Sequence, residues 1–149
     1  MAIAYKRDKK DARVFAMLGD GETNEGQVWE AVEAAVKYGL DNLVIIVDNN
    51  GLQNDGACAD IMPTQDLCDK FKSFGCRTFC IDGHDMEQIV SVFEKIRMER
   101  GCCKPFAVVA KTVKGKGVSF MENVVKWHGV APNDDEYKMA MAELEVGLK

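Results

Sequence analysis

The sequence predicts an α/β fold, in which a parallel β-sheet carries helices on both faces. Four short runs of β-branched and aliphatic residues are nearly continuous rather than alternating, as expected of strands that are covered on both faces. These runs are residues 14–19 (VFAMLG), 42–49 (NLVIIVDN), 77–82 (RTFCID) and 106–112 (FAVVAKT). Segments with helical spacing of apolar residues lie between them, and this alternation is typical of a parallel sheet joined by crossover helices.

The first two connecting helices are marked by apolar spacing and by glycines that follow them. After the first strand, an apolar stripe at helical spacing is formed by Val28, Val32, Ala35 and Val36. Gly39 is expected to end this helix, because glycine readily adopts the left-handed conformation found after many helices. Before the third strand, we expect a helix that Thr64 caps, that runs through Phe74 and that Gly75 ends.

Two later helices carry capping signals. Asp85 and Gln88 have the spacing of a capping box, in which the side chains of the N-cap and of the third helical residue bond to backbone N–H groups. The stripe that follows this box consists of Met86, Ile89, Val90, Phe93 and Ile96. The last helix is expected to start after Asn133, with Glu136 at its third position, and to run toward Glu145.

Composition indicates one soluble domain over residues 1–149, a length that can bury a core. The formal net charge of −5 argues against nucleic acid and anionic membranes as partners. No apolar run approaches the length of a transmembrane helix, and the charged N-terminal stretch lacks the apolar region of a signal peptide. We therefore expect a cytoplasmic protein. Its six cysteines form no CxxC pair, so we expect reduced thiols rather than disulfides or a zinc site.

Polar residues follow the first two strands, at the edge of the sheet where such folds bind ligands. Gly19, Asp20 and Gly21 end the first strand, and Asn50 and Gly51 follow the second. A carboxylate and an amide oxygen are hard ligands that suit Mg²⁺ or Ca²⁺. The next helix points its N-terminus at the same place, which favours a phosphate. The pattern suits a diphosphate held through a divalent metal.

The same motifs also occur in ordinary turns, and GDG or NNG alone would indicate nothing more. Their joint occurrence at the ends of successive strands favours a binding site. The GDG stretch is not a P-loop, because no GK[ST] follows it, and it lacks the third glycine of a dinucleotide-binding fingerprint.

The GDG motif, followed about thirty residues later by NN, resembles the thiamine-diphosphate-binding motif. The sequence is most similar to transketolases, and specifically to the amino-terminal subunit of split transketolases. The stretches that carry this resemblance are GETNEGQVWEA, DNNGLQNDG, IDGHD and KTVKGKGVSFMENVVKWHG. The similarity extends from residue 1 to about residue 132 and implies a diphosphate-type thiamine-binding domain.

The resemblance implies a cofactor site that holds thiamine diphosphate through Mg²⁺ or Ca²⁺. It implies that Asp20 ligates the metal through its carboxylate, Asn50 through its side-chain oxygen and Leu52 through its backbone carbonyl. Gly19, Gly21, Glu25 and Asn50 would bind the cofactor, with the Gly21 N–H donating to the diphosphate.

Further roles follow from the same resemblance. Glu25 stands where the family has an acid at the subunit interface, close to the cofactor, and His128 matches a catalytic histidine near the diphosphate and the substrate channel. Asn54 departs from the aliphatic residue that many relatives carry near the cofactor ring. We interpret His84 as part of a turn, and the lysines of residues 111–116 as either a site for phosphorylated sugars or a solvated loop.

The resemblance also implies an enzyme that acts as part of a heteromer. The reaction would transfer a two-carbon ketol unit from a ketose phosphate to an aldose phosphate, as in the pentose phosphate pathway. A partner, the carboxy-terminal transketolase subunit, would supply the pyrimidine-binding domain and the glutamate that activates the cofactor. The isolated chain is expected to be inactive.

Family members have a long segment before the residues that match Met1, so we expect a truncated domain here. The alternatives are a non-catalytic fragment unable to bind cofactor alone, or the alpha subunit of a 2-oxo acid dehydrogenase, which also carries GDG and NN. Deoxyxylulose-phosphate synthase is a third relative, without the close match in the later loop.

Overall fold

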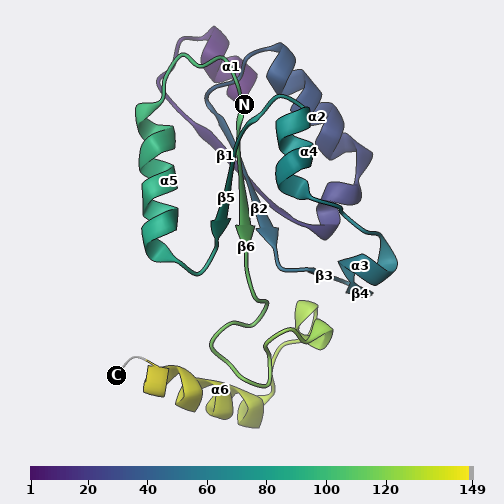
Figure 1. The fold of residues 1–149 in the computed structure, drawn as a ribbon. Helices are drawn as coiled ribbons and strands as arrows, with labels where there is room; N and C mark the ends of the chain where they lie inside the picture. Colours follow the sequence, from purple (N-terminus) through teal and green to yellow (C-terminus); the bar gives the residue numbers. More distant parts are fainter. Residues whose placement is uncertain (148–149) are drawn as a thin grey trace.

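A four-stranded parallel sheet forms the centre of the protein in a computed structural model that describes residues 1–147. The strand order is β1-β2-β6-β5 (Figure 1). The strands are β1 (Val14–Gly19), β2 (Leu43–Asn49), β5 (Arg77–Asp82) and β6 (Phe106–Lys111). The predicted α/β class is confirmed, and each predicted strand agrees with the observed one to within a residue at either end.

The register of the sheet sets the carboxyl ends of its strands level with one another. Gly19 at the end of β1 pairs with Asp48 of β2, and Asp48 pairs with Ala110 of β6. The GDG stretch and the NNG stretch therefore leave the sheet side by side.

Helices cover both faces of the sheet, as predicted (Figure 1). On one face, α2 (Gly26–Lys37) and α4 (Leu67–Ser73) bury Val32, Leu67 and Phe71 against β2 and β6. On the other face, α5 (Met86–Met98) buries Val92 and Ile96 against the same two strands. Gly39 has a φ of +58° two residues after α2, so it ends this helix as predicted. The short α1 (Ala2–Arg7) packs through Ala2 against Ala35 and Leu40.

The cover over β1 is incomplete. The continuous apolar run of this strand predicted burial on both faces, but Phe15 is 56% exposed and Met17 is 71% exposed. Both point to the α5 side, where the Phe15 ring lies 6.3 Å from that of Phe93. The prediction is wrong for this face because β1 is an edge strand and α5 packs over β2 and β6 instead.

Local capping chemistry places the later helices. The Asp85 carboxylate accepts N–H bonds from Glu87 and Gln88, which starts α5 as predicted. Asn133 and Glu136 form both arms of a capping box at the start of α6 (Asp134–Gly147). The predicted cap of α4 is wrong. Its N-cap is Asp66, which accepts the N–H of Asp69, whereas Thr64 lies before a residue with a φ of +60°.

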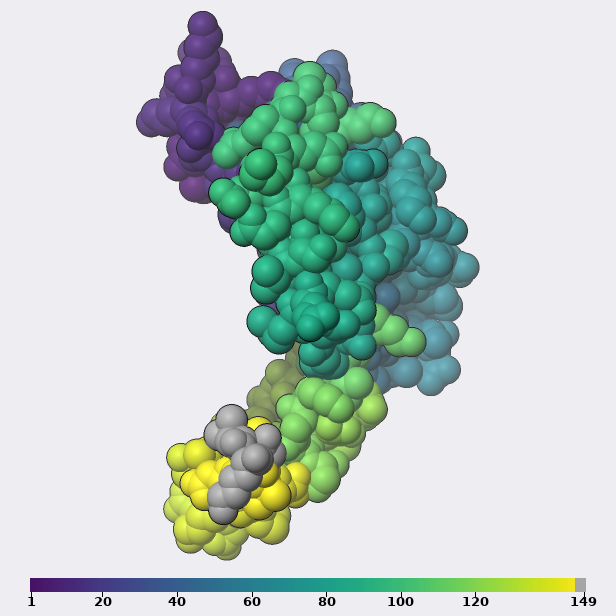
Figure 2. All heavy atoms as spheres, turned by 60° about the vertical axis from the view of Figure 1, so that its left-hand side comes forward, coloured from purple at the N-terminus to yellow at the C-terminus, as the bar shows by residue number. Residues whose placement is uncertain are grey.

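Short elements and one long segment complete the chain. The 3₁₀ helix η1 (Gly21–Asn24), the hairpin of β3 (Leu52–Gln53) and β4 (Gly56–Ala57), and α3 (Cys58–Ile61) lie near the carboxyl ends of β1 and β2. Residues 112–133 carry the 3₁₀ helix η2 (Val125–His128) and lead to α6. This segment and α6 project below the sheet, and a waist separates them from the main body (Figure 2). Within residues 1–147, every helix is too short or too polar to cross a bilayer.

A disulfide joins Cys68 near the start of α4 to Cys80 on β5, with 6.2 Å between the Cα atoms. The expectation that all thiols are reduced is therefore wrong for this pair. The crossover from α4 to β5 brings the two residues together, which their separation of 12 residues in the sequence does not reveal. Cys58, Cys76, Cys102 and Cys103 are free.

Candidate cofactor and metal site

The buried carboxylate of Asp20 connects the GDG turn to the NNG turn. Asp20 is 1% exposed and directly follows β1. Its Oδ1 accepts the N–H of Gly21 at 2.8 Å, and its Oδ2 accepts the N–H of Gly51 at 2.6 Å. The Cys58 thiol also lies 3.5 Å from Oδ1. The convergence of the two turns that the sequence predicts is therefore found in the structure.

Cys58 is a hydrogen-bond donor to this carboxylate rather than a thiolate. Burial raises the pKa of its thiol to about 11, and the nearby charge and hydrogen bond of Asp20 act in the same direction. The thiol therefore keeps its proton at neutral pH. Sequence reasoning missed this contact, because Cys58 lies on α3, far from the GDG motif in the sequence.

Asn50 is held at both ends of its amide group. Its Oδ1 accepts the N–H of Leu52 at 2.9 Å, and its Nδ2 donates to Oδ2 of Asp48 at 3.1 Å. The backbone carbonyl of Asp48 also accepts the N–H of Asp20, at 3.1 Å. Asp48 was not predicted as a site residue, although an acid directly before the NN pair could have been a signal.

A hollow of about 510 Å³ lies where these turns meet. Six predicted site residues line it, namely Gly19, Asp20, Gly21, Asn50, Leu52 and His128. Lys114 and Asp48 line it too. Glu25 does not, since it is exposed at the junction between η1 and α2. One long segment, which is far from both motifs in the sequence, thus supplies a cation and a histidine to the GDG and NNG turns.

Two contacts within the protein shape the backbone of the GDG turn. A Cβ atom on Gly21 would lie 2.8 Å from the Cβ of Gln53, so only glycine fits beside the β3–β4 hairpin. The N–H of Gly19 donates to the carboxylate of Glu22 at 2.6 Å. An anionic group therefore already occupies one of the backbone donors at this turn.

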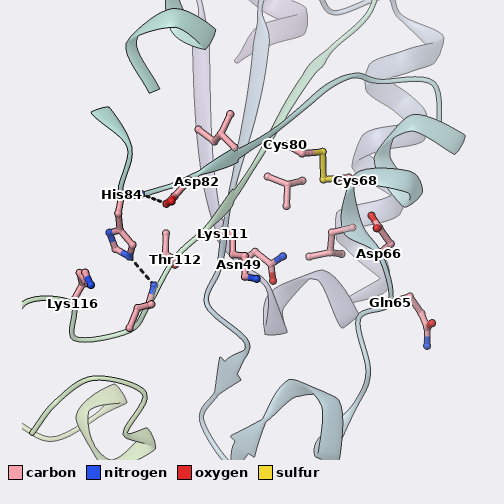
Figure 3. Close-up of a pocket in the computed structure, with 14 residues that line it drawn as sticks. Asn49, Gln65, Asp66, Cys68, Cys80, Asp82, His84, Lys111, Thr112 and Lys116 are labelled. Carbon is pink, nitrogen blue, oxygen red and sulfur yellow. Dashed lines mark hydrogen bonds between the residues drawn. A yellow bond between two sulfur atoms is a disulfide. The ribbon is translucent and has the colours of Figure 1, made fainter. Parts of the chain in front are cut away.

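The long segment that carries Lys114 and His128 is fastened to the sheet near its start. The N–H of Val113 donates to Nε2 of His84 at 2.8 Å, a bond drawn in Figure 3. His84 lies in the turn before α5, as predicted, but this bond gives it a further role that the sequence did not indicate. Farther along, the Trp127 indole donates to the carbonyl of Phe120 at 3.2 Å and sets the position next to His128.

A larger hollow of about 820 Å³ lies on the α4 and β5 side of the same edge (Figure 3). The Cys68–Cys80 disulfide lies on its wall, and its lining mixes Lys111 and Lys116 with Asp66 and Asp82. Neither Asp20 nor Asn50 reaches it. Because neither predicted side-chain ligand of the metal lines this hollow, the smaller hollow is the stronger candidate for a cofactor site.

Comparison with known proteins agrees with this geometry. Residues 3–148 match the family described as transketolase, thiamine diphosphate binding domain. The chain belongs to this transketolase family.

Several transketolase relatives show how much of a longer protein the chain represents. It is 39% identical to one subunit of the apulose-4-phosphate transketolase of Phocaeicola vulgatus, over 97% of this chain and 50% of the relative. It is equally similar to the 6-deoxy-6-sulfo-D-fructose transketolase subunit SqwG of a Clostridium species, of which it covers 52%. The chain therefore spans about half the length of the curated relatives it matches.

The transketolase fold is also found among solved structures. The transketolase of Campylobacter jejuni superposes with a TM-score of 0.85 at 27% identity, over 97% of this chain and 23% of that one. The resemblance drawn from the GDG and NN motifs is thus confirmed at the level of family and fold.

The residues around the hollow fit the thiamine diphosphate that the transketolase family binds. The carboxylate, amide oxygen and backbone carbonyl that the resemblance assigns to the metal are all oxygen donors, which Mg²⁺ and Ca²⁺ prefer. No group of three or more His, Cys, Asp or Glu side chains in residues 1–147 could hold a metal ion. The predicted ligand set of Asp20, Asn50 and Leu52 contains only one such side chain, so it does not depend on a cluster of that kind.

Proposed function

We propose that this chain is the diphosphate- and metal-binding part of a two-subunit transketolase. It would bind thiamine diphosphate through Mg²⁺ or Ca²⁺, and a partner subunit would supply the pyrimidine-binding domain. The single observation that carries the proposal is the Asp20 carboxylate, which bonds to the N–H groups of Gly21 and Gly51 and so joins the two motif turns in one hollow.

Each group at the hollow has a distinct role in this proposal. Asp20, Asn50 and the Leu52 carbonyl would hold the metal, and the Gly21 N–H would turn from Asp20 to the diphosphate. His128 would face the substrate from the long segment. When bound, thiamine diphosphate supplies the nucleophilic carbon and the electron sink for ketol transfer.

Charge at the hollow supports a metal-dependent mode of binding. Asp20, Glu22 and Asp48 bring three carboxylates, and Lys114 brings one cation. A diphosphate entering this site would be repelled by the excess negative charge unless a divalent cation came with it. Binding of the cofactor should therefore require the metal, rather than merely improve with it.

The substrates of the relatives indicate the class of sugar. One relative is named for apulose 4-phosphate and another for 6-deoxy-6-sulfo-D-fructose, so both names describe sugars with an anionic substituent. We propose that this chain takes part in two-carbon ketol transfer between sugars of this kind. The family match favours this function over a 2-oxo acid dehydrogenase.

The test is a titration of thiamine diphosphate, followed by calorimetry, with Mg²⁺ and then with EDTA. We expect the wild type to bind only with the metal, and Asp20→Ala to lose binding. The matched control is Asp55→Ala, which removes an exposed carboxylate in the turn between β3 and β4 and should bind as the wild type does.

Two other outcomes would count against the proposal in different ways. If Asp20→Ala bound the cofactor as well as the wild type, the metal assignment would be wrong. If the wild type failed to bind even with Mg²⁺, the alternative of a chain unable to bind cofactor alone would be supported. The exposed apolar side of β1 gives that alternative its structural basis.

A further inference from the structure

We propose that Asp48 is a positioning residue, which orients the amide of Asn50 toward the metal and ties the segment carrying Lys114 and His128 to the same site. The inference rests on the proposed function, because it concerns how the metal ligands are held. It is carried by three contacts of one side chain and its backbone.

Asp48 touches both predicted side-chain ligands of the metal. It is the next-to-last residue of β2, paired between Gly19 and Ala110 in the sheet. Its backbone carbonyl accepts the N–H of Asp20 at 3.1 Å, and its Oδ2 accepts the Nδ2–H of Asn50 at 3.1 Å. A residue of a central strand therefore holds the backbone of one ligand and the side chain of the other.

The carboxylate of Asp48 decides which end of the Asn50 amide faces it. An amide has an oxygen and an NH₂ group of similar shape at its two ends, and their hydrogen-bond partners determine the orientation. An ionised carboxylate only accepts hydrogen bonds, so it selects the NH₂ end. The oxygen of Asn50 is thereby kept on the side of the Gly51–Leu52 turn, where Gly51 bonds to Asp20. A flipped amide would instead present its NH₂ group to a cation.

The other oxygen of Asp48 fastens the long segment. The Thr112 hydroxyl donates to Oδ1 of Asp48, and the Thr112 N–H donates to the carbonyl of Asn49 at 3.2 Å. The Thr112 methyl is closely packed on Gly83, because a Cβ atom on that glycine would lie 2.4 Å from it. Thr112 is thus held from two sides at the point where the segment leaves β6. Asp48 therefore couples the position of the segment that carries Lys114 and His128 to that of the proposed metal ligand Asn50.

The rival explanation is that Asp48 itself ligates the metal, since its carboxylate also lines the hollow. The two explanations differ in how Asp48 and Asn50 depend on each other. A residue that acts through Asn50 adds little once Asn50 is gone, whereas an independent ligand loses its own contribution in either background.

The experiment combines Asp48→Ala, Asn50→Ala and the double variant, with Asp55→Ala as the control. Nuclear magnetic resonance first follows the side-chain NH₂ signal of Asn50 without metal or cofactor, assigned by its loss in Asn50→Ala. Titration then gives the Mg²⁺ concentration that half-saturates cofactor binding. We expect Asp48→Ala to shift the NH₂ signal. We also expect it to raise the Mg²⁺ concentration that half-saturates cofactor binding by about 10- to 100-fold.

The double variant should then bind more weakly than Asn50→Ala by no more than Thr112→Val weakens the wild type, because Asp48 acts only through Asn50 and Thr112. Thr112→Val should also weaken cofactor binding, because it removes the hydroxyl that donates to Asp48. Thr112→Ser keeps this hydroxyl and should bind the cofactor as the wild type does. The inference is overturned if the NH₂ signal is unchanged in Asp48→Ala, or if the two single effects multiply in the double variant. If the wild type binds no cofactor, the proposed function fails, and the NH₂ signal still decides whether Asp48 orients Asn50.

Discussion

Substitution of Gly83 by alanine tests how tightly the end of β6 is packed against the turn after β5. An added Cβ atom would lie 2.4 Å from the Thr112 methyl, 3.1 Å from the Cβ of Ala110 and 3.1 Å from the carbonyl oxygen of Lys111. The backbone cannot easily move away, because the Gly83 N–H donates to that same carbonyl at 2.7 Å. Thr112 must therefore shift and weaken its bond to Asp48.

The cost follows from these contacts. Overpacking by one methyl group in a well-packed region costs about 1–3 kcal/mol of unfolding free energy. Loss of a hydrogen bond to a charged group costs about 1.5–3 kcal/mol, and the two effects overlap because both act on Thr112. We expect a total of about 2–4 kcal/mol, which corresponds to a melting temperature lower by roughly 5–15 °C for a chain of this size.

Urea unfolding of three variants measures this cost. The control is Gly26→Ala at the first residue of α2, where an added Cβ atom meets nothing within 4 Å and where alanine should leave stability unchanged or slightly higher. In Gly83→Ala/Thr112→Ser the methyl group at 2.4 Å is absent while the hydroxyl remains, so most of the stability should return. The packing argument is refuted if Gly83→Ala costs no more than the control, or if serine at position 112 does not rescue it.

Two further predictions concern the cysteines. Reduction of Cys68–Cys80 should lower the free energy of unfolding by up to about 3 kcal/mol, because the disulfide closes a loop and so restricts the unfolded chain. The stability of the control variant Cys68→Ser/Cys80→Ser should not respond to reductant. Denaturation with and without dithiothreitol checks this, and an equal response of both proteins would contradict it. Burial raises the pKa of Cys76 to about 11, so at pH 8 its thiolate is about 100-fold scarcer than that of an ordinary thiol. Cys76 should therefore react with a thiol-labelling reagent far more slowly than the exposed Cys103. Because the pKa of Cys76 is higher in the folded than in the unfolded state, its contribution to stability should fall as pH rises from about 9 to 11. Equal labelling rates of Cys76 and Cys103 would show that Cys76 is not buried.

Local signals in the sequence were sufficient for the elements and for part of the site. The strands at residues 14–19 and 77–82 have the predicted bounds, because glycine or acidic turn residues follow each run, although neither of these edge strands is buried as predicted. The caps at Asp85 and Asn133 were also predicted, because a capping box involves residues only three positions apart. The convergence of Asp20 and Asn50 followed from a general property of parallel sheets, whose strand ends lie at one edge.

Some local choices depend on backbone angles that residue types do not reveal. Thr64 was the predicted N-cap of α4, although aspartate is preferred over threonine at N-caps. The structure selects Asp66, because Gln65 has a positive φ and the helix can begin only after it.

The contacts that complete the site were decided by tertiary structure alone. Asp48 meets Thr112 across 64 residues of sequence, and His84 meets Val113 across 29, through side-chain geometry that no local pattern encodes. The Cys68–Cys80 bond likewise arises from the packing of α4 beside β5. By itself, the sequence determined the strand-end turns and the candidate residues for a metal and a diphosphate, because spacing and residue type are local properties. Only the folded sheet determined which side chains hold those residues in place, because orientation depends on neighbours that are distant in the chain.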